Sequence, residues 1–109
     1  MTIYSVDEIR SRVLPVAKKH GLKAVYLFGS YARGTATSES DVDLLVDISG
    51  TGIKSLLQLS AVLCDFEDAL GKRVDLVTTR SLEKPIRMPS DRYFRNNLQN
   101  ERIEIYAVA

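Results

Sequence analysis

Leu27-Phe28-Gly29-Ser30 and, after a spacer of ten residues, Asp41-Val42-Asp43-Leu44 are the two stretches that decide the fold of this chain. The first is the end of an apolar strand with the tight turn that follows it, and the second opens another strand. Alternate residues of a strand point to the same face, so Asp41 and Asp43 share one face. Two neighbouring carboxylates repel each other unless a cation lies between them, and oxygen ligands suit Mg²⁺. The spacing therefore predicts metal-assisted phosphoryl or nucleotidyl chemistry.

The Gly29-Ser30 turn adds a second element to this chemistry. Glycine accepts a positive φ and lets the backbone approach a ligand closely. Ser30 begins a turn whose backbone N–H groups are unpaired, and such groups favour an anion such as phosphate. Because many strands end in a Gly-Ser turn that binds nothing, the pair is informative only together with the aspartates.

A third carboxylate lies on the next predicted strand, where Asp75 stands between two apolar residues. A carboxylate in a strand suited to burial is costly unless it is paired or bound to a metal. If this strand lies beside the second one, Asp75 completes a cluster of three carboxylates with Asp41 and Asp43. An ion pair between Asp75 and one of its basic neighbours is the alternative.

Capping, turn and periodicity signals along the chain predict a small α/β domain. The order helix, strand, strand, helix, strand, helix, strand indicates a mixed β-sheet of about four strands packed with helices, with the last strand at a sheet edge. No repeat or linker interrupts residues 1–109, so we expect a single domain. Residues 31–40 are expected to form a loop with one helical turn. The expected helices cover residues 5–20, 54–70 and 90–100, and the expected strands cover residues 24–28, 41–48, 73–78 and 103–108.

The helix expected over residues 54–70 has a wide apolar face that begins with Leu56 and Leu57. Cys64 lies within this apolar pattern, so we expect a buried and inert thiol. It is the single cysteine of the chain, which excludes a disulfide within the chain and a metal site built from cysteines.

Composition narrows the class of function. The 109 residues are 45% hydrophobic and 27% charged, with a formal net charge of +1, which gives no electrostatic reason to expect nucleic acid as the substrate. No secretory segment opens the chain and no apolar run is long enough to span a membrane, so we expect a cytoplasmic protein. One C-terminal segment is locally basic and partly aromatic, which fits either a solvated helix face or a contact with nucleotide or partner. Its residues are Arg87, Arg92, Tyr93, Phe94, Arg95 and Arg102.

The glycine, serine and aspartate positions also carry a family resemblance. The stretch Leu27-Phe28-Gly29-Ser30-Tyr31-Ala32-Arg33-Gly34, with Ser40-Asp41-Val42-Asp43-Leu44-Leu45-Val46 after it, resembles the nucleotidyltransferase superfamily that includes DNA polymerase β. Within that superfamily, the short length and the Arg33-Gly34 ending are similar to the minimal nucleotidyltransferase (MNT) domain proteins. The resemblance extends over residues 24–78, and the rest of the chain is compatible with it in length.

This resemblance implies transfer of a nucleoside monophosphate from a nucleoside triphosphate to a hydroxyl, with pyrophosphate as the leaving group. Asp41 and Asp43 would hold Mg²⁺, with two ions expected, and Asp75 would bind the ion on the acceptor side. Gly29 and Ser30 would hold the β- and γ-phosphates through a backbone N–H and a hydroxyl.

Arg33 stands at the end of the same motif. It would add positive charge on the phosphate side, and an ion pair with a neighbouring acid is the alternative.

The resemblance also implies a partner. MNT proteins are similar to antitoxins paired with a small helical HEPN-type ribonuclease toxin, for which ATP is the donor and AMP is placed on a tyrosine of the toxin. With no second domain expected, acceptor binding would come from a partner or from self-association into homo- or hetero-oligomers. Two alternatives stay open. One is an adenylyltransferase that acts on a small-molecule hydroxyl, and the other is a non-catalytic, nucleotide-binding antitoxin that acts by contact alone.

Overall fold

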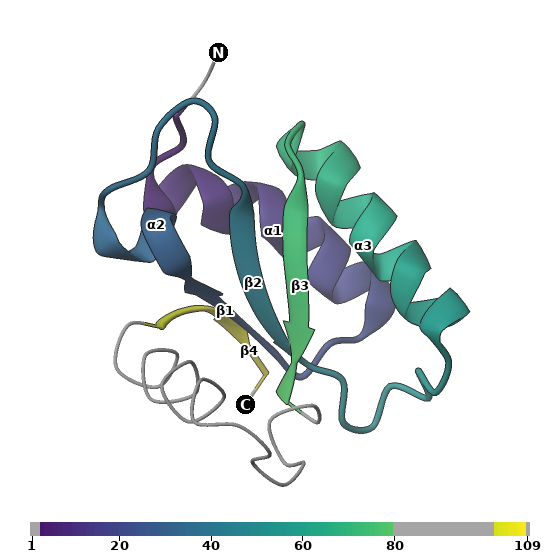
Figure 1. Ribbon diagram of the computed structural model, residues 1–109. Coiled ribbons are helices and arrows are strands. Elements are labelled where there is room, and N and C mark those ends of the chain that lie inside the picture. Colours follow the sequence, from purple (N-terminus) through teal and green to yellow (C-terminus); the bar gives the residue numbers. More distant parts are fainter. Residues whose placement is uncertain (1–2, 80–101, 109) are drawn as a thin grey trace, which may run out of the picture.

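A computed structural model describes residues 3–79 and 102–108 of the chain (Figure 1). Every predicted strand is present, and each ends within one residue of its expected bounds. The helix predicted over residues 90–100 lies outside the described residues, as does the basic segment around it except for Arg102. Among the described residues, no helix is long and apolar enough to cross a lipid bilayer. The elements are α1 (Val6–His20), β1 (Ala24–Phe28), α2 (Gly29–Arg33), β2 (Val42–Asp47), α3 (Leu56–Leu70), β3 (Val74–Thr78) and β4 (Ile103–Ala107).

The four strands form one mixed sheet in the order β3-β2-β1-β4. β1 is antiparallel to both β2 and β4, whereas β2 and β3 are parallel. Parallel neighbours need a crossover connection, and α3 provides it between β2 and β3. Figure 1 shows α1 and α3 side by side behind the sheet, so both long helices cover the same face. The predicted α/β class, the four-stranded mixed sheet and the edge position of β4 are confirmed.

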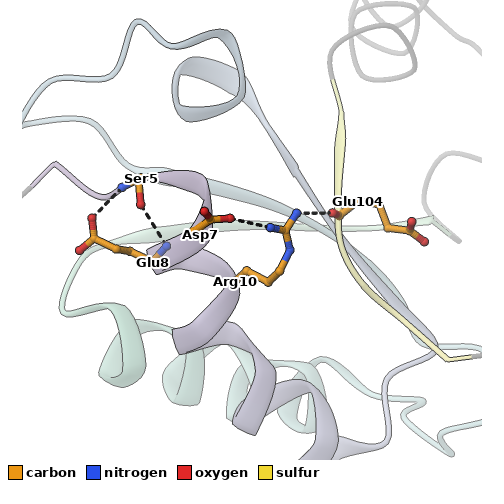
Figure 2. Close-up of polar contacts among 5 residues, drawn as sticks. All are labelled: Ser5, Asp7, Glu8, Arg10 and Glu104. Carbon is orange, nitrogen blue, oxygen red and sulfur yellow. Dashed lines mark hydrogen bonds and ion pairs between the residues drawn. The ribbon is translucent and has the colours of Figure 1, made fainter.

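α1 begins and ends at the residues that the sequence signals predict. Ser5 accepts a hydrogen bond from the Glu8 N–H, and the Glu8 side chain accepts one from the Ser5 N–H, which completes a capping box (Figure 2). Gly21 ends the helix in the left-handed conformation, with φ 64°. Arg10 donates to Asp7 at 2.9 Å and to the Glu104 carbonyl at 3.2 Å, so it links α1 to the edge strand β4 (Figure 2).

The core lies between the two long helices and the sheet. α1 contributes the stripe that its periodicity predicts, and β1 and β2 contribute the residues that face the helices. The fully or nearly fully buried members from these elements are Ile9, Val13, Val16, Ala17, Val25, Leu27, Val42, Leu44 and Val46. A second, smaller cluster around Phe28 and Leu45 lies apart from this core.

α3 packs through a narrower face than the sequence predicts. Ser55 caps its first turn, one residue after the expected start, and Gly71 ends it. Its buried residues are Val62, Phe66 and Leu70, spaced four apart on one stripe. With 3.6 residues per turn, neither of the first two leucines of α3 falls on that stripe. The expectation that both belong to a buried face is wrong, because Leu56 is 82% exposed and Leu57 is 83% exposed.

The buried thiol expected at Cys64 is also wrong. Cys64 is exposed, because it stands two residues from both Val62 and Phe66, and residues two apart on a helix do not share a face.

We expect the Cys64 thiol of the native protein to react completely with a chromogenic thiol reagent, without prior unfolding, because its side chain faces solvent. The colour released from native and from denatured protein measures this, and a Cys64→Ser variant gives the background. A native protein that reacts only when denatured would contradict the orientation of α3.

Candidate active site

The predicted carboxylates lie at neighbouring positions where β2 and β3 begin. In the parallel register, Asp43 of β2 lies opposite Asp75 of β3. The Val42 N–H donates to the Arg73 carbonyl at 3.0 Å, which fixes this register at the start of both strands. Asp41 directly precedes β2. The structure therefore places the third strand beside the second, as the sequence analysis requires for a cluster of three carboxylates.

β1 brings the Gly-Ser turn to the same carboxylate. Phe28, the last residue of β1, lies opposite Asp43 in the antiparallel register, and Gly29 follows it. The φ of Gly29 is 74°, a left-handed value that favours glycine. A Cβ on Gly29 would lie 2.0 Å from Oδ2 of Asp43 and 2.9 Å from its Cγ. The close approach predicted for this glycine is thus made by a carboxylate of the chain itself.

The other two residues predicted to bind nucleotide lie on α2. This helix begins at Gly29, directly after β1, and not within the loop expected over residues 31–40. Ser30 lies in its first turn, and Arg33 is its last residue. Arg33 is exposed, and its positive charge lowers the pKa of Asp43. Gly29 at the start of α2 thus lies against the Asp43 carboxylate, and Arg33 at the end of α2 acts on the same carboxylate through its charge.

This arrangement disfavours the ionised form of the Asp43 carboxyl. Its pKa is raised from the ordinary 3.8 to about 6, first because the side chain is partly buried, and then because Asp75 and Asp41 are negative. The charge of Arg33 opposes the rise only in part. An acid with such a pKa sits where its surroundings disfavour the ionised form. At neutral pH, above this pKa, the carboxylate is mostly ionised, and the site therefore favours a cation.

The sequence predicts that Asp75 is the carboxylate that burial desolvates, but in the structure that carboxylate is Asp43. Asp75 is exposed, because its side chain lies on the face of the outer strand opposite to that of Val74 and Leu76, which pack against the core under the two long helices. Asp47, at the far end of β2, differs from both. Its pKa is lowered, first by hydrogen bonding with the Ser49 side chain and also by the Ser49 N–H, which donates to Oδ1 at 2.9 Å. The pKa values of two carboxylates of one strand are thus shifted in opposite directions, and of these two it is Asp43 whose pKa is raised by acidic neighbours.

The donor set fits Mg²⁺ better than a metal with a closed protein site. Within residues 3–79 and 102–108, no three acidic, histidine or cysteine side chains are gathered into a preassembled metal centre. Mg²⁺ does not require one, because it commonly keeps several waters and binds one or two carboxylates together with substrate phosphates. Asp43 and the nearer of its two acidic neighbours, Asp41 or Asp75, would be enough for such a site. These residues fit an ion that binds with a nucleotide.

Two side chains that the sequence analysis did not identify support this site. The Glu67 carboxylate on α3 accepts a hydrogen bond from the Val74 N–H at 3.1 Å, one residue before Asp75. Lys72 donates to the Ser38 carbonyl at 3.0 Å and so joins the turn before β3 to the loop before Asp41. No sequence signal identifies these residues, because both contacts depend on how α3 and the loop pack.

The pH dependence of stability should report the shift of Asp43. Its folded pKa is raised to about 6, so between pH 3.8 and 6 the folded protein holds a proton that the unfolded chain has lost. Stability of the metal-free protein therefore falls as pH rises through this window, and stays lower above it. We expect Asp43→Asn to remove this fall, as measured by thermal unfolding across that range. For Asp47, whose pKa is lowered, the sign is opposite, and Asp47→Asn should cost stability above the ordinary pKa of 3.8, with the effect fading as pH falls below that value. A wild-type profile that matches that of Asp43→Asn would contradict the shift.

The comparisons with known proteins agree with this geometry. A family model described as a nucleotidyltransferase domain matches residues 9–105. The chain therefore belongs to the nucleotidyltransferase family.

Within the family, the similarity is to small members. The chain is 41% identical over 91 residues to the protein adenylyltransferase MntA of Thermococcus cleftensis, with 79% of this chain and 89% of that protein covered. It is 42% identical over 78 residues to a Methanocaldococcus jannaschii protein provisionally named a protein adenylyltransferase, with 72% and 82% covered. It is thus a minimal nucleotidyltransferase domain protein, related to MntA.

Solved structures share its fold. One provisionally named a minimal nucleotidyltransferase superposes with a TM-score of 0.67 at 31% identity and covers 94% of this chain and 98% of that chain. A toxin–antitoxin structure with AMP-PNP gives a TM-score of 0.68 at 21% identity, with 91% and 73% covered. The complex of a tri-AMPylated Shewanella oneidensis HEPN toxin with its MNT antitoxin gives 0.64 at 17% identity, with 94% and 73% covered. At these lower identities the last two show the common fold alone.

Proposed function

We propose that this chain transfers AMP from ATP to a tyrosine hydroxyl of a HEPN-type toxin and thereby acts as its antitoxin. The observation that carries the proposal is Asp43, which lies against Gly29 and opposite Asp75 with its pKa raised to about 6. Further support comes from relatives that are named protein adenylyltransferases and from a similar fold found with a tri-AMPylated HEPN toxin.

In this proposal the three aspartates orient the reactants. Asp41 and Asp43 would hold the Mg²⁺ that accompanies ATP, and Asp75, on the outer strand, would bind the ion on the acceptor side. When bound, the ion neutralises phosphate charge and lowers the pKa of the acceptor hydroxyl. The partly buried position of Asp43 strengthens its attraction for a cation, because less water screens the charge.

The phosphate side of the site is formed by the Gly-Ser turn and the helix after it. The Gly29 N–H and the Ser30 hydroxyl bind the β- and γ-phosphates, and Arg33 adds positive charge there. The acceptor oxygen forms a bond to the α-phosphorus and loses its proton to solvent. The bond from the α-phosphorus to the bridging oxygen breaks, and pyrophosphate leaves with the electron pair.

The direct test incubates the protein with ATP labelled at the α-phosphate, Mg²⁺ and a purified HEPN-type toxin as the candidate acceptor. We expect label on that protein, its loss when a tyrosine is replaced by phenylalanine, and its loss with Asp41→Asn. Label on a small-molecule hydroxyl in place of protein would replace the proposed acceptor. Full neutralisation of the toxin by Asp41→Asn, without any transfer, would favour an antitoxin that acts by contact.

A further inference from the structure

The turn between α3 and β3 lies beside the start of β2 (Figure 1) and holds the chain there at two points, one on each side of Asp41. Lys72 donates to the Ser38 carbonyl at 3.0 Å, three residues before Asp41. The Val42 N–H, one residue after Asp41, donates to the Arg73 carbonyl at 3.0 Å. Asp41 therefore lies between two contacts that are made by neighbouring residues of one turn.

The turn itself is well supported, because the elements before and after it are both held by side chains. The Tyr4 hydroxyl donates to the Leu70 carbonyl at the end of α3, at 2.6 Å. The Glu67 carboxylate accepts a hydrogen bond from the Val74 N–H at the start of β3, at 3.1 Å. Lys72 thus extends from a part of the fold that is fixed on both sides.

The loop that leads into Asp41 depends more strongly on the contact with Lys72. Its other hydrogen bonds are made within the loop: the Ser40 N–H donates to the Thr37 carbonyl at 3.0 Å, and the Ser40 hydroxyl accepts from the Thr37 N–H at 2.9 Å. Within the described residues, the hydrogen bond from Lys72 is the one that joins residues 37–40 to another part of the fold. Without it, the chain at Asp41 would be held from the β2 side alone.

Lys72 makes this contact with a neutral carbonyl and not with an acid. Glu39 and Asp41 lie close to that carbonyl in the sequence, yet the described part of the chain contains no ion pair of Lys72. The basic side chain whose charge lowers the pKa of Asp43 is Arg33. A hydrogen bond constrains direction as well as distance, which suits Lys72 to holding the loop in place. Its positive charge, taken alone, would repel a cation at the aspartates.

We propose that Lys72 is a positioning residue, which holds the loop before β2 so that the Asp41 carboxylate is in place to bind the ion that accompanies ATP. The inference rests on the proposed function, because it takes Asp41 as a ligand of that ion. Lys72 acts through the main chain at Ser38 and touches neither the ion nor the reacting atoms.

The test measures binding of Mn²⁺ alone, from the loss of the electron paramagnetic resonance signal of the free ion. Lys72→Met removes the donor and keeps the aliphatic stem. We expect it to raise the Kd for Mn²⁺ by about tenfold, the loss typical of residues that orient metal ligands. Removal of a positive charge, taken alone, would lower the Kd, so the sign of the change separates position from charge. Lys72→Arg keeps a donor and the charge, and should bind Mn²⁺ nearly as well as the wild type.

Transfer of labelled AMP to a purified HEPN-type toxin gives a second readout. In Lys72→Met, the Mg²⁺ concentration for half-maximal transfer should rise by about tenfold. The KM for ATP at saturating Mg²⁺ should stay within about twofold, because Lys72 does not touch nucleotide in this proposal. A raised KM for ATP with an unchanged Kd for Mn²⁺ would show that Lys72 binds phosphate, and would overturn the positioning role.

Arg10→Met is the matched control. Arg10 also donates to a main-chain carbonyl, that of Glu104 at 3.2 Å, but at the opposite edge of the sheet. It should lose similar stability in thermal unfolding and keep the wild-type Kd for Mn²⁺. An equal rise of the Kd in both variants would mean general destabilisation and would overturn the role of Lys72.

The role of Lys72 and the proposed function can fail separately. An unchanged or lower Kd for Mn²⁺ in Lys72→Met, while Asp41→Asn raises it, overturns the positioning role and leaves the proposed function intact. Absence of label transfer by the wild-type protein, with Mn²⁺ binding that still depends on Lys72, overturns the proposed function alone.

Discussion

Asp43→Asn is expected to reduce nucleotidyl transfer by at least about 10³-fold while leaving the metal-free protein as stable as the wild type, or more stable, at neutral pH. The activity falls because a metal ligand beside the reacting phosphate is worth several kcal/mol in the transition state, and each 1.36 kcal/mol is tenfold. Stability does not fall because the ionised carboxylate is disfavoured by burial and by Asp75 and Asp41. Label transfer from ATP and thermal unfolding, measured on the same preparation, test both halves.

Asp47→Asn is the matched control on the same strand. Its carboxylate is stabilised by hydrogen bonding to Ser49, so the substitution should lower stability and leave transfer unchanged. Asp43→Asn should thus lose activity and keep its stability, whereas Asp47→Asn should lose stability and keep its activity. If Asp43→Asn were to lower stability and keep its activity, Asp43 would be a structural residue and the proposed site would be wrong.

Gly29→Ala is expected to lower transfer by about 10²-fold and to destabilise the fold. The backbone at φ 74° costs a residue with a Cβ about 1–2 kcal/mol. The added Cβ would also lie 2.0 Å from Oδ2 of Asp43, so the carboxylate must move. A displacement of about 1 Å at a reacting centre can cost about 10²-fold in rate. Single-turnover transfer at saturating ATP measures the rate, and denaturant unfolding measures the stability.

Gly50→Ala separates the two causes. Gly50 has nearly the same φ, 78°, and a Cβ there meets no atom within 4 Å. It should therefore lose a similar backbone energy and keep its activity. Equal losses of activity in both variants would mean that general destabilisation, and not the contact with Asp43, explains the effect of Gly29→Ala.

Local signals in the sequence are sufficient to predict most of the fold. The Ser5 and Glu8 capping box, the strand alternation of β2 and the glycines at helix ends act within a few residues, and the structure places each as predicted. The pairing of Asp43 with Asp75 was predicted only conditionally, because register between strands separated by a helix depends on the crossover. The family resemblance is confirmed by a domain match over residues 9–105.

The sequence does not predict correctly which side chains of α3 and β3 are buried, and the reason is physical. Cys64, Leu56 and Leu57 all read as parts of an apolar helix face, yet the core accepts only the stripe of α3 that faces α1 and the sheet. Likewise, the apolar residues that flank Asp75 predict a buried carboxylate, but Asp75 lies on the face of β3 that the helices leave uncovered. The width of an apolar pattern does not reveal how much of it the neighbours cover.

The central proposal is that the aspartates at the start of β2 and β3 bind the ion that accompanies ATP. Crystals of the protein with Mn²⁺ and a non-hydrolysable ATP analogue, measured for the anomalous signal of manganese, test it most directly. We predict an anomalous peak within coordination distance of Asp41 and Asp43, with the phosphates beside Gly29 and Ser30. Bound nucleotide with no peak at these carboxylates, or with its phosphates away from the Gly-Ser turn, would contradict the proposal.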